Sequence, residues 1–398
     1  MKIKGKLKSI RNKAVRRVYK ILFLLISKLP VKKGTVIFES FHGKQFSCNP
    51  RAIYEFMIEY CPEYNLIWSV NKAYKKQFED RGIYYINRLS IKWLFKMARA
   101  EYWVINSRLP LWIPKPAHTT YIQTWHGTPL KRLAMDMDEV LMPGTNTESY
   151  KKNFVKEASN WDYLISPNQY SSEIFTRAFC FNKKMLETGY PRNDILYQEN
   201  NLSYIKNIKN KLNIPLTKKV ILYAPTWRDN KFYRKGKYKF DLDLDLNMLN
   251  EALSDEYVII LRMHYLVAEN FDLERYKGFV IDCSLYEDIR DLYLISDLLI
   301  TDYSSVFFDY ANLKRPMLFF VPDLEEYRDN LRGFYFDFEK EAPGPLLKTT
   351  QEVIDQIKSL NEIPKNNSVL ESFYEKFCYL ENGNSTKKVV EKIFNLDL

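Results

Sequence analysis

Short apolar runs of strand length alternate with helical segments over most of this chain, and this alternation constrains the fold more than any other feature. Strands that are separated by helices pair in parallel, and the helices then cover both faces of the sheet. The pattern therefore predicts an α/β protein with doubly wound parallel sheets. In the first half, the predicted strands are 35–41, 66–70, 84–86, 102–106, 120–125 and 162–166, and the predicted helices are 52–60, 91–100 and 148–158. In the second half, the predicted strands are 220–224, 257–261, 279–282, 298–301 and 317–321, and the predicted helices are 285–295, 305–313, 351–360, 370–378 and 387–394.

The length of the chain, 398 residues, exceeds that of one typical domain and favours two. Residues 200–215 are polar and carry no strand pattern, so the boundary between the domains is predicted there. We expect a first Rossmann-like domain over residues 31–205 and a second over 206–398, whose final helices can pack back on the first. Residues 1–30 form a separate segment of different composition.

Residues 1–30 combine regularly spaced apolar side chains with many basic ones, which is typical of an amphipathic helix. The apolar run 21–26 is too short to span a bilayer, which needs about 20 residues, and the residues after it make a poor signal-peptide cleavage site. We expect a helix that lies on an anionic membrane surface. Its predicted contacts are Lys13, Arg16, Arg17, Lys20 and Phe23. The alternatives are a helix packed on the domain and an arm that binds nucleic acid.

The formal net charge of +11 indicates an anionic partner, which can be a nucleic acid, a phosphorylated substrate or an acidic membrane. A nucleic-acid-binding protein is disfavoured, because the 29 tyrosines and 25 phenylalanines are spread along the predicted strands and helices as core residues are. The five cysteines are scattered and form no CxxC pair. They indicate reduced thiols in a cytoplasmic protein, without a disulfide framework or a zinc site.

Polar residues follow the predicted strand 298–301, and a helix is expected to begin among them at Ser304 and Ser305. The first backbone N–H groups of a helix lack intrahelical partners. Together with the two hydroxyls and the positive end of the helix dipole, they suit a phosphate group. The alternative is that Ser304 only caps the helix.

Three further strand ends carry groups that suit catalysis or phosphate binding. His126 ends a strand beside Gly127, where a histidine can act as a general base near neutral pH, with a structural histidine as the alternative. After the predicted strand 220–224, Thr226 and Arg228 offer a hydroxyl and a guanidinium to a phosphate, and the alternative is an ordinary exit from a strand. At the end of the predicted strand 257–261, Arg262 and His264 alternate with apolar neighbours and are expected to point to the same side, which favours a functional role for the pair.

Ligands of doubly wound sheets bind beyond the carboxyl ends of the strands, which is where all of these residues are predicted to lie. Phosphate-suited groups occur in the second domain and a candidate base in the first. This distribution predicts a transferase that binds a nucleotide diphosphate donor in one domain and an acceptor in the other. The sequence contains no P-loop, no GxGxxG motif and no His–His–carboxylate set for a metal.

The motifs at these strand ends resemble, in their order and spacing, those of the CDP-glycerol glycerophosphotransferases of wall teichoic acid synthesis in Gram-positive bacteria. The resembling segments are 124–129 (TWHGTP), 223–228 (YAPTWR), 262–264 (RMH) and 301–305 (TDYSS), joined by 39–44 (ESFHGK) and 332–335 (RGFY). The similarity runs from about residue 34 to the C-terminus. It is greatest to the branch that extends a glycerol phosphate primer.

The resemblance implies a GT-B fold, in which the first domain faces the acceptor and the second binds CDP-glycerol. It implies peripheral binding to the cytoplasmic face of the membrane. Catalytic roles are implied for His126 and His264. The residues expected to bind the donor and its diphosphate are Ser304, Ser305, Arg262, Arg228, Thr226 and Asp302, and those on the acceptor side are Gly127 and Thr128.

The implied reaction transfers glycerol phosphate from CDP-glycerol to the terminal glycerol phosphate of an undecaprenyl-diphosphate-linked disaccharide and releases CMP. Alternatives are a ribitolphosphotransferase that uses CDP-ribitol, a first-step glycerophosphate primase, and a sugar-nucleotide glycosyltransferase of the same fold. The sequence leaves open how many units are added and whether the chain forms a homo-oligomer. No protein metal site is predicted, although Mg²⁺ can accompany the donor diphosphate.

Overall fold

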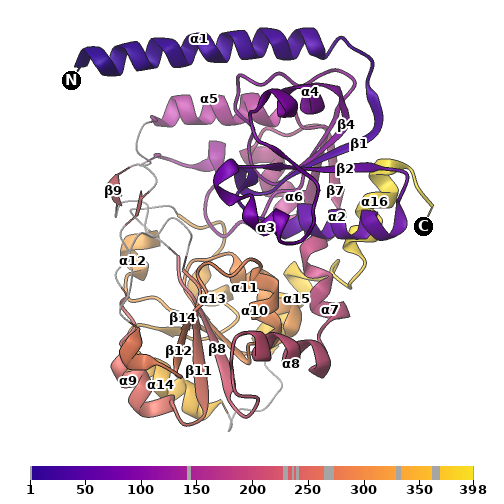
Figure 1. Ribbon diagram of the computed structural model, residues 1–398. Coiled ribbons are helices and arrows are strands. Elements are labelled where there is room, and N and C mark those ends of the chain that lie inside the picture. The colour runs from indigo at the N-terminus through magenta and orange to yellow at the C-terminus, as the bar shows by residue number, and fades with distance from the viewer. Residues whose placement is uncertain are drawn as a thin grey trace.

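The computed structural model describes residues 2–140, 145–226, 232–234, 237–238, 242–263, 273–328, 333–360 and 368–397, with the backbone alone for residues 2–12, 232–234 and 237–238. Two parallel sheets organise this part of the chain into two domains, one above the other in Figure 1. The predicted α/β class, with two doubly wound sheets, is therefore confirmed.

The first domain is built on a seven-stranded parallel sheet with the strand order β3-β2-β1-β4-β5-β6-β7. Its apolar side chains are buried on both faces of the sheet, as they are for Trp103 on one face and Trp68 on the other. The strands are β1 (Lys32–Glu39), β2 (Asn65–Val70), β3 (Tyr85–Asn87), β4 (Ala100–Ile105), β5 (Thr120–Gln123), β6 (Tyr163–Ser166) and β7 (Lys184–Glu187). The helices are α2 (Cys48–Tyr60), α3 (Lys76–Glu79), α4 (Ile91–Arg99), α5 (Thr147–Ala158) and α6 (Gln169–Ala178).

The second domain is built on a six-stranded parallel sheet with the order β12-β11-β8-β13-β14-β15. The chain order reverses between β8 and β13, and a ligand crevice is expected outside the carboxyl ends of two such strands. The strands are β8 (Lys219–Ala224), β11 (Tyr257–Leu261), β12 (Val280–Asp282), β13 (Leu298–Thr301), β14 (Met317–Phe320) and β15 (Leu346–Leu347), with a separate hairpin of β9 (Phe232–Arg234) and β10 (Lys237–Tyr238). The helices are α7 (Ile195–Gln198), α8 (Leu202–Lys211), α9 (Leu246–Leu253), α10 (Ile289–Ile295), α11 (Val306–Tyr310), α12 (Leu324–Glu326), α13 (Phe338–Glu341), α14 (Thr350–Ser359) and α15 (Ser368–Phe377).

The predicted strands 257–261 and 298–301 coincide with β11 and β13. The elements without a counterpart in the prediction include β7, α6, α8 and α9. β7 buries one of its four residues, so it lacks an apolar run. α8 is mostly polar, but its Ile208 is buried in the core of the second domain. The boundary predicted at residue 205 therefore falls inside a helix that packs on the second sheet.

The predicted helix 305–313 is shorter than expected. It consists of α11, five residues long, followed by the 3₁₀ turn Ala311–Leu313. The dipole of so short a helix adds less to anion binding than a long helix does. The hydroxyls and backbone N–H groups at its start are then the main groups that could receive a phosphate.

The last helix, α16 (Ser385–Phe394), leaves the second domain and packs against α2 of the first, as Figure 1 shows. Val389, Val390 and Phe394 are buried in the core that also contains the side chains of β1 and β2. The chain thus passes between the domains twice, and the first domain is completed by C-terminal residues.

The N-terminal helix α1 (Lys2–Ile26) lies across the first domain, at the top of Figure 1, and contacts α4. Phe23 is completely buried, with its ring centre 6.4 Å from that of Trp103. This overturns the expectation that Phe23 contacts a membrane, because the side chain is already covered by the first domain.

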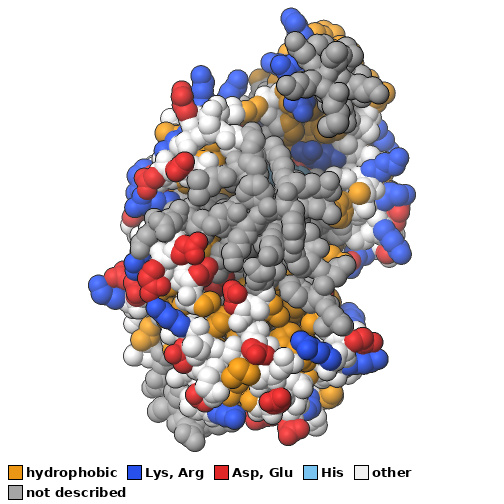
Figure 2. Space-filling model, turned by 90° about the vertical axis from the view of Figure 1, so that its left-hand side faces the viewer, with side chains coloured by type: hydrophobic (Ala, Val, Ile, Leu, Met, Phe, Trp, Pro, Cys, Tyr) orange, Lys and Arg blue, Asp and Glu red, His pale blue; other side chains and the backbone are white. Residues whose placement is uncertain are grey.

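The outer face of α1 is both apolar and basic. Its exposed apolar side chains are Val15, Val18, Ile21, Leu22, Leu24 and Leu25, and its exposed basic ones include Lys13, Arg16, Arg17 and Lys20. Figure 2 shows hydrophobic and basic side chains next to each other near the top, where this helix lies. Across the described residues, no helix is both long and apolar enough to cross a membrane.

Candidate active site

A cavity of about 250 Å³ lies between the two domains, at the carboxyl ends of their strands. The residues that line it include Phe41, Cys48 and His126 from the first domain and Arg262, Ser304 and Ser305 from the second. The cavity is therefore at the place where doubly wound sheets bind ligands. It brings together several residues that the sequence had marked separately.

His126 follows β5 and is partly buried in the cavity wall. Its Nδ1 lies 2.7 Å from the backbone carbonyl oxygen of Asn106. Because a carbonyl oxygen only accepts hydrogen bonds, Nδ1 carries the proton and Nε2 carries the lone pair. Nε2 is therefore the atom that can take a proton from a substrate hydroxyl.

The surroundings of His126 keep its ring neutral. Burial lowers the pKa to about 4, the hydrogen bond to Asn106 acts in the opposite direction, and the positive charge of Arg192 lowers the pKa further. An anionic ligand near Arg192 would offset that charge and raise the pKa. His126 would then be a stronger base when a phosphorylated donor occupies the cavity.

The loop that carries His126 touches the turn that carries the two serines. A Cβ atom placed on Gly127 would lie only 2.7 Å from Oγ of Ser305. Glycine at position 127 therefore permits an approach of the two domains that a larger residue would obstruct. Thr128, the other predicted acceptor-side residue, is buried with 4% of its surface exposed.

Helix capping uses the hydroxyls of Ser304 and Ser305 only weakly. The N–H of Val306 lies 3.5 Å from Oγ of Ser304, at the limit of hydrogen-bonding distance, and Ser305 makes no side-chain cap. Both serines line the cavity. Their position favours the phosphate-binding interpretation over a cap alone.

Asp302 and Thr226 join the ends of two neighbouring strands. Oδ1 of Asp302 accepts a hydrogen bond of 2.9 Å from the backbone N–H of Thr226, and both residues are buried. Asp302 thus fixes the loop after β8 to the end of β13. Its carboxylate acts on the protein backbone here, where it supports the shape of the crevice.

Arg262 lines the cavity but uses one end of its guanidinium on the protein. Its Nη1 lies within donating distance of the backbone carbonyl oxygens of Cys283, Ser284 and Tyr286, at 2.6, 2.8 and 2.6 Å. Arg262 therefore shapes the loop before α10. The predicted residues His264 and Arg228 lie outside the described residues.

The segment predicted from the RGFY motif links the domains. Lys131, shortly after His126, forms an antiparallel bridge with Phe334, and the N–H of Tyr335 donates to the carbonyl of Leu130 at 2.8 Å. The loop of His126 is thus anchored on the second domain. Arg332 of this motif lies outside the described residues.

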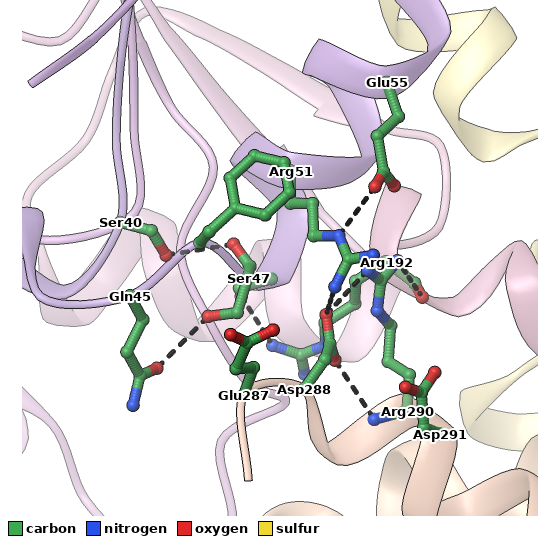
Figure 3. Close-up of polar contacts among 12 residues, drawn as sticks. Ser40, Gln45, Ser47, Arg51, Glu55, Arg192, Glu287, Asp288, Arg290 and Asp291 are labelled. Carbon is green, nitrogen blue, oxygen red and sulfur yellow. Dashed lines mark hydrogen bonds and ion pairs between the residues drawn. The ribbon is translucent and has the colours of Figure 1, made fainter. Parts of the chain in front are cut away.

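Charged residues that the sequence analysis missed are buried beside the cavity. Asp288 forms ion pairs with Arg290 at 2.6 Å and with Arg51 of the first domain at 3.2 Å, as Figure 3 shows. Burial alone would raise the pKa of Asp288, but the charges of these arginines hold it well below its usual range. This cluster joins α2 to the start of α10 across the domain interface.

Arg192 is a second missed residue, and it too is buried in the cavity wall. Its Nη2 donates to Oδ1 of Asp309 in α11 at 2.7 Å. The sequence does contain a signal for it, because Gly189 and Pro191 mark a turn of the kind that follows the other strand ends. The strand before this turn, β7, was not predicted, so the turn was not recognised as a strand end.

Among the described residues, no three His, Cys, Asp or Glu side chains come together as a metal site would require. The charged groups around the cavity that the structure describes pair with one another or face the protein backbone. The cavity is lined by a neutral histidine, by serine side chains that include Ser304 and Ser305, and by buried arginines. This combination suits a proton transfer next to a bound phosphate.

A family model described as CDP-Glycerol:Poly(glycerophosphate) glycerophosphotransferase matches residues 21–395. The teichoic acid poly(glycerol phosphate) polymerase of Bacillus subtilis (strain 168) is 69% identical over 98% of this chain and 53% of that protein, so the chain spans about half the length of this relative. The protein of the same name from Bacillus spizizenii (strain ATCC 23059 / NRRL B-14472 / W23) is 61% identical over 95% of this chain and 96% of that protein.

A solved structure of a variant of the wall teichoic acid polymerase TagF, soaked with CDPG, superposes on both domains. It covers 99% of this chain and 97% of that chain, with a TM-score of 0.88 and 43% sequence identity. The expected GT-B architecture is confirmed by this agreement over the full length. The chain therefore belongs to the CDP-glycerol:poly(glycerophosphate) glycerophosphotransferase family, as its motifs predicted.

Proposed function

We propose that this enzyme transfers glycerol phosphate from CDP-glycerol to the terminal glycerol phosphate of an undecaprenyl-diphosphate-linked disaccharide and releases CMP. The observation that carries the proposal is the pairing of a basic Nε2 on His126 with the hydroxyls of Ser304 and Ser305 at one interdomain cavity. The names of the two polymerases and the solved structure soaked with CDPG support the same donor and product class.

The proposed step is a direct phosphoryl transfer. Nε2 of His126 accepts the proton of the acceptor's terminal hydroxyl, and that oxygen attacks the glycerol-bearing phosphorus of the donor. The bond from this phosphorus to the bridging oxygen breaks, and CMP leaves with the electron pair. Positioning and charge stabilisation carry most of the rate enhancement in reactions of this kind.

The donor diphosphate would lie against Ser304, Ser305 and the N–H groups that begin α11. His264, expected from the family resemblance to assist there, completes this part of the proposal. The negative charge of the diphosphate would raise the pKa of His126 as it binds. The base would thus gain strength only when the donor is in place.

The proposal includes peripheral binding of α1 to the cytoplasmic face of an anionic membrane. The exposed apolar and basic side chains on its outer face support this, since such a face binds the interface of an acidic bilayer. Membrane binding would bring the cavity close to the lipid-linked acceptor.

The variant His126→Ala tests the assignment of the base. We expect turnover of labelled CDP-glycerol with a glycerol-phosphate-ended lipid acceptor to fall by about 10²- to 10⁴-fold. Binding of CDP-glycerol, measured by calorimetry, stays close to that of the wild type. The loss follows from removing the only proton acceptor assigned to the attacking hydroxyl.

The matched control is His118→Ala, since His118 is also partly buried in the first domain but is not among the residues that line the cavity. It retains turnover. Full activity of His126→Ala would refute the base assignment. Transfer from CDP-ribitol or a UDP-sugar, with none from CDP-glycerol, would refute the proposed donor.

A further inference from the structure

Asn49, in the first turn of α2, bonds to the loop of the proposed base through its side chain. It has no exposed surface. Its Nδ2 donates to the backbone carbonyl oxygens of Thr124 at 3.0 Å and Trp125 at 3.2 Å. Its Oδ1 accepts from the backbone N–H of Arg192 at 3.1 Å. The two N–H groups of the amide are therefore both used on the turn that leads into His126.

That turn is conformationally strained. Trp125 has a φ of 50°, in the left-handed region that a bulky residue seldom adopts. Such a conformation persists only where the surrounding structure enforces it. The N–H of Trp125 donates to Oε1 of Gln123 at 3.0 Å, and its carbonyl accepts from Asn49. Both backbone groups of the strained residue are thus restrained by buried side chains.

The conformation of Trp125 determines where the base points. The indole ring stacks on the imidazole of His126, with ring centres 4.6 Å apart and planes inclined by 28°. If Trp125 relaxed to a negative φ, the peptide that follows it would rotate and carry the imidazole with it. The hydrogen bond between Nδ1 and Asn106 would then no longer be maintained.

Asn49 is also connected to the second domain, through Arg192. Arg192, whose N–H donates to Oδ1 of Asn49, uses its own Nη2 on Asp309 of α11. Asp309 lies one helical turn after Ser305 on the same short helix. The loop that carries His126 and the helix that follows the two serines are therefore connected through two buried residues, Asn49 and Arg192.

We propose that Asn49 is a positioning residue that holds the strained Trp125–His126 turn and aligns it, through Arg192, with the turn of Ser304 and Ser305. The inference rests on the proposed function of His126. Asn49 contacts no reacting atom. It acts by holding Nε2 of His126 in the correct position relative to the donor phosphate that the second domain would bind.

The substitution Asn49→Asp tests this most directly. It preserves the size of the side chain and the acceptor for the N–H of Arg192. A carboxylate cannot donate to the carbonyls of Thr124 and Trp125, so the turn is released. We expect kcat to fall by about 10- to 100-fold, and KM for CDP-glycerol to change by less than about 3-fold, because only the alignment of the base is altered.

The matched control is Asn168→Asp. Asn168 is also buried with no exposed surface, and its Nδ2 donates to the carbonyl of Phe377 in the second domain at 2.7 Å. Its Oδ1 caps α6 by accepting from Ser171, which an aspartate also does. The control thus loses a comparable buried hydrogen bond across the interface, away from His126. We expect it to lower the melting temperature but to leave kcat close to that of the wild type.

A second variant, Asn49→Ala, avoids a buried charge and serves if Asn49→Asp does not fold. In this variant we expect the same fall in kcat. We also expect the acidic limb of the pH profile of kcat/KM to move to higher pH, because the released imidazole gains contact with water. A residue that merely supports the fold would not move this limb.

The inference is overturned if a folded Asn49 variant keeps the wild-type kcat, or if its loss of kcat equals that of Asn168→Asp with an unchanged pH profile. These outcomes are distinct from a failure of the proposed function. If wild-type enzyme transfers no glycerol phosphate from CDP-glycerol, the function itself is refuted. If the wild type is active and the Asn49 variants are fully active, only the positioning role is refuted.

Discussion

The contact between Gly127 and Ser305 offers a direct test of how closely the two halves of the site must approach. Replacing Gly127 by alanine places a Cβ 2.7 Å from Oγ and 3.3 Å from Cβ of Ser305, whereas ordinary contacts begin near 3.4 Å. The missing separation is about 0.7 Å, and φ at this position is not in the left-handed region, so the collision is the main effect of the change. Either the serine rotates away from its place at the cavity or the two loops move apart.

Both responses displace a group of the proposed site by a large fraction of an ångström. A misplacement of 1 Å can reduce a rate by about 10²-fold, so we expect Gly127→Ala to lower kcat/KM by about 10- to 100-fold. The overall stability should change by less than about 1 kcal/mol, because the contact lies at a cavity and not in a packed core. Initial rates with labelled CDP-glycerol, together with thermal melting, measure the two effects.

A double-mutant cycle with Ser305→Ala separates the collision from other effects. Removing Oγ of Ser305 deletes the closest contact, so Gly127→Ala should be less damaging in that background than in the wild type. We expect a coupling of about 1 kcal/mol or more in transition-state stabilisation. Strictly additive losses would refute the reasoning, since they would mean that the two loops do not meet as described.

Two further predictions concern pH and the N-terminal helix. His126 must be neutral to accept a proton, and burial lowers its pKa to about 4, so kcat/KM should be retained above this pH and lost as the pH falls through it. The pH profile of kcat reports the donor-bound enzyme and should therefore decline at a higher pH. A midpoint near 6.5 for kcat/KM would contradict the shielding of the ring. Replacing Leu22 and Leu25 by serine should weaken co-sedimentation with anionic vesicles by about 10-fold or more, at unchanged melting temperature. Phe23→Ala should instead destabilise the fold by about 3–5 kcal/mol. Loss of stability in the leucine variant and loss of vesicle binding alone in Phe23→Ala would refute the placement of these side chains.

The local strand–helix pattern predicted the two sheets because it depends on neighbours along the chain. β11 and β13 are continuous buried runs bounded by polar residues, and their ends were predicted correctly. β7 and α8 were missed because their stability comes from tertiary contacts and not from an apolar pattern of their own. The burial of Phe23 could not be predicted for the same reason. An apolar residue of an amphipathic helix can face a membrane or a domain, and only the tertiary packing decides which.

By itself the sequence determined the fold class and the strand ends at which chemistry occurs, because these follow from hydrophobic periodicity and from the order of residues around each strand. The tertiary structure alone decided which of these ends meet. It placed Gly127 against Ser305 and fixed the tautomer of His126 through the carbonyl of Asn106. It also gave Asn49 and Arg192 their roles, because their partners lie more than 70 residues away along the chain: the first domain brings Asn49 to Thr124 and Arg192, and the packing of the two domains brings Arg192 to Asp309.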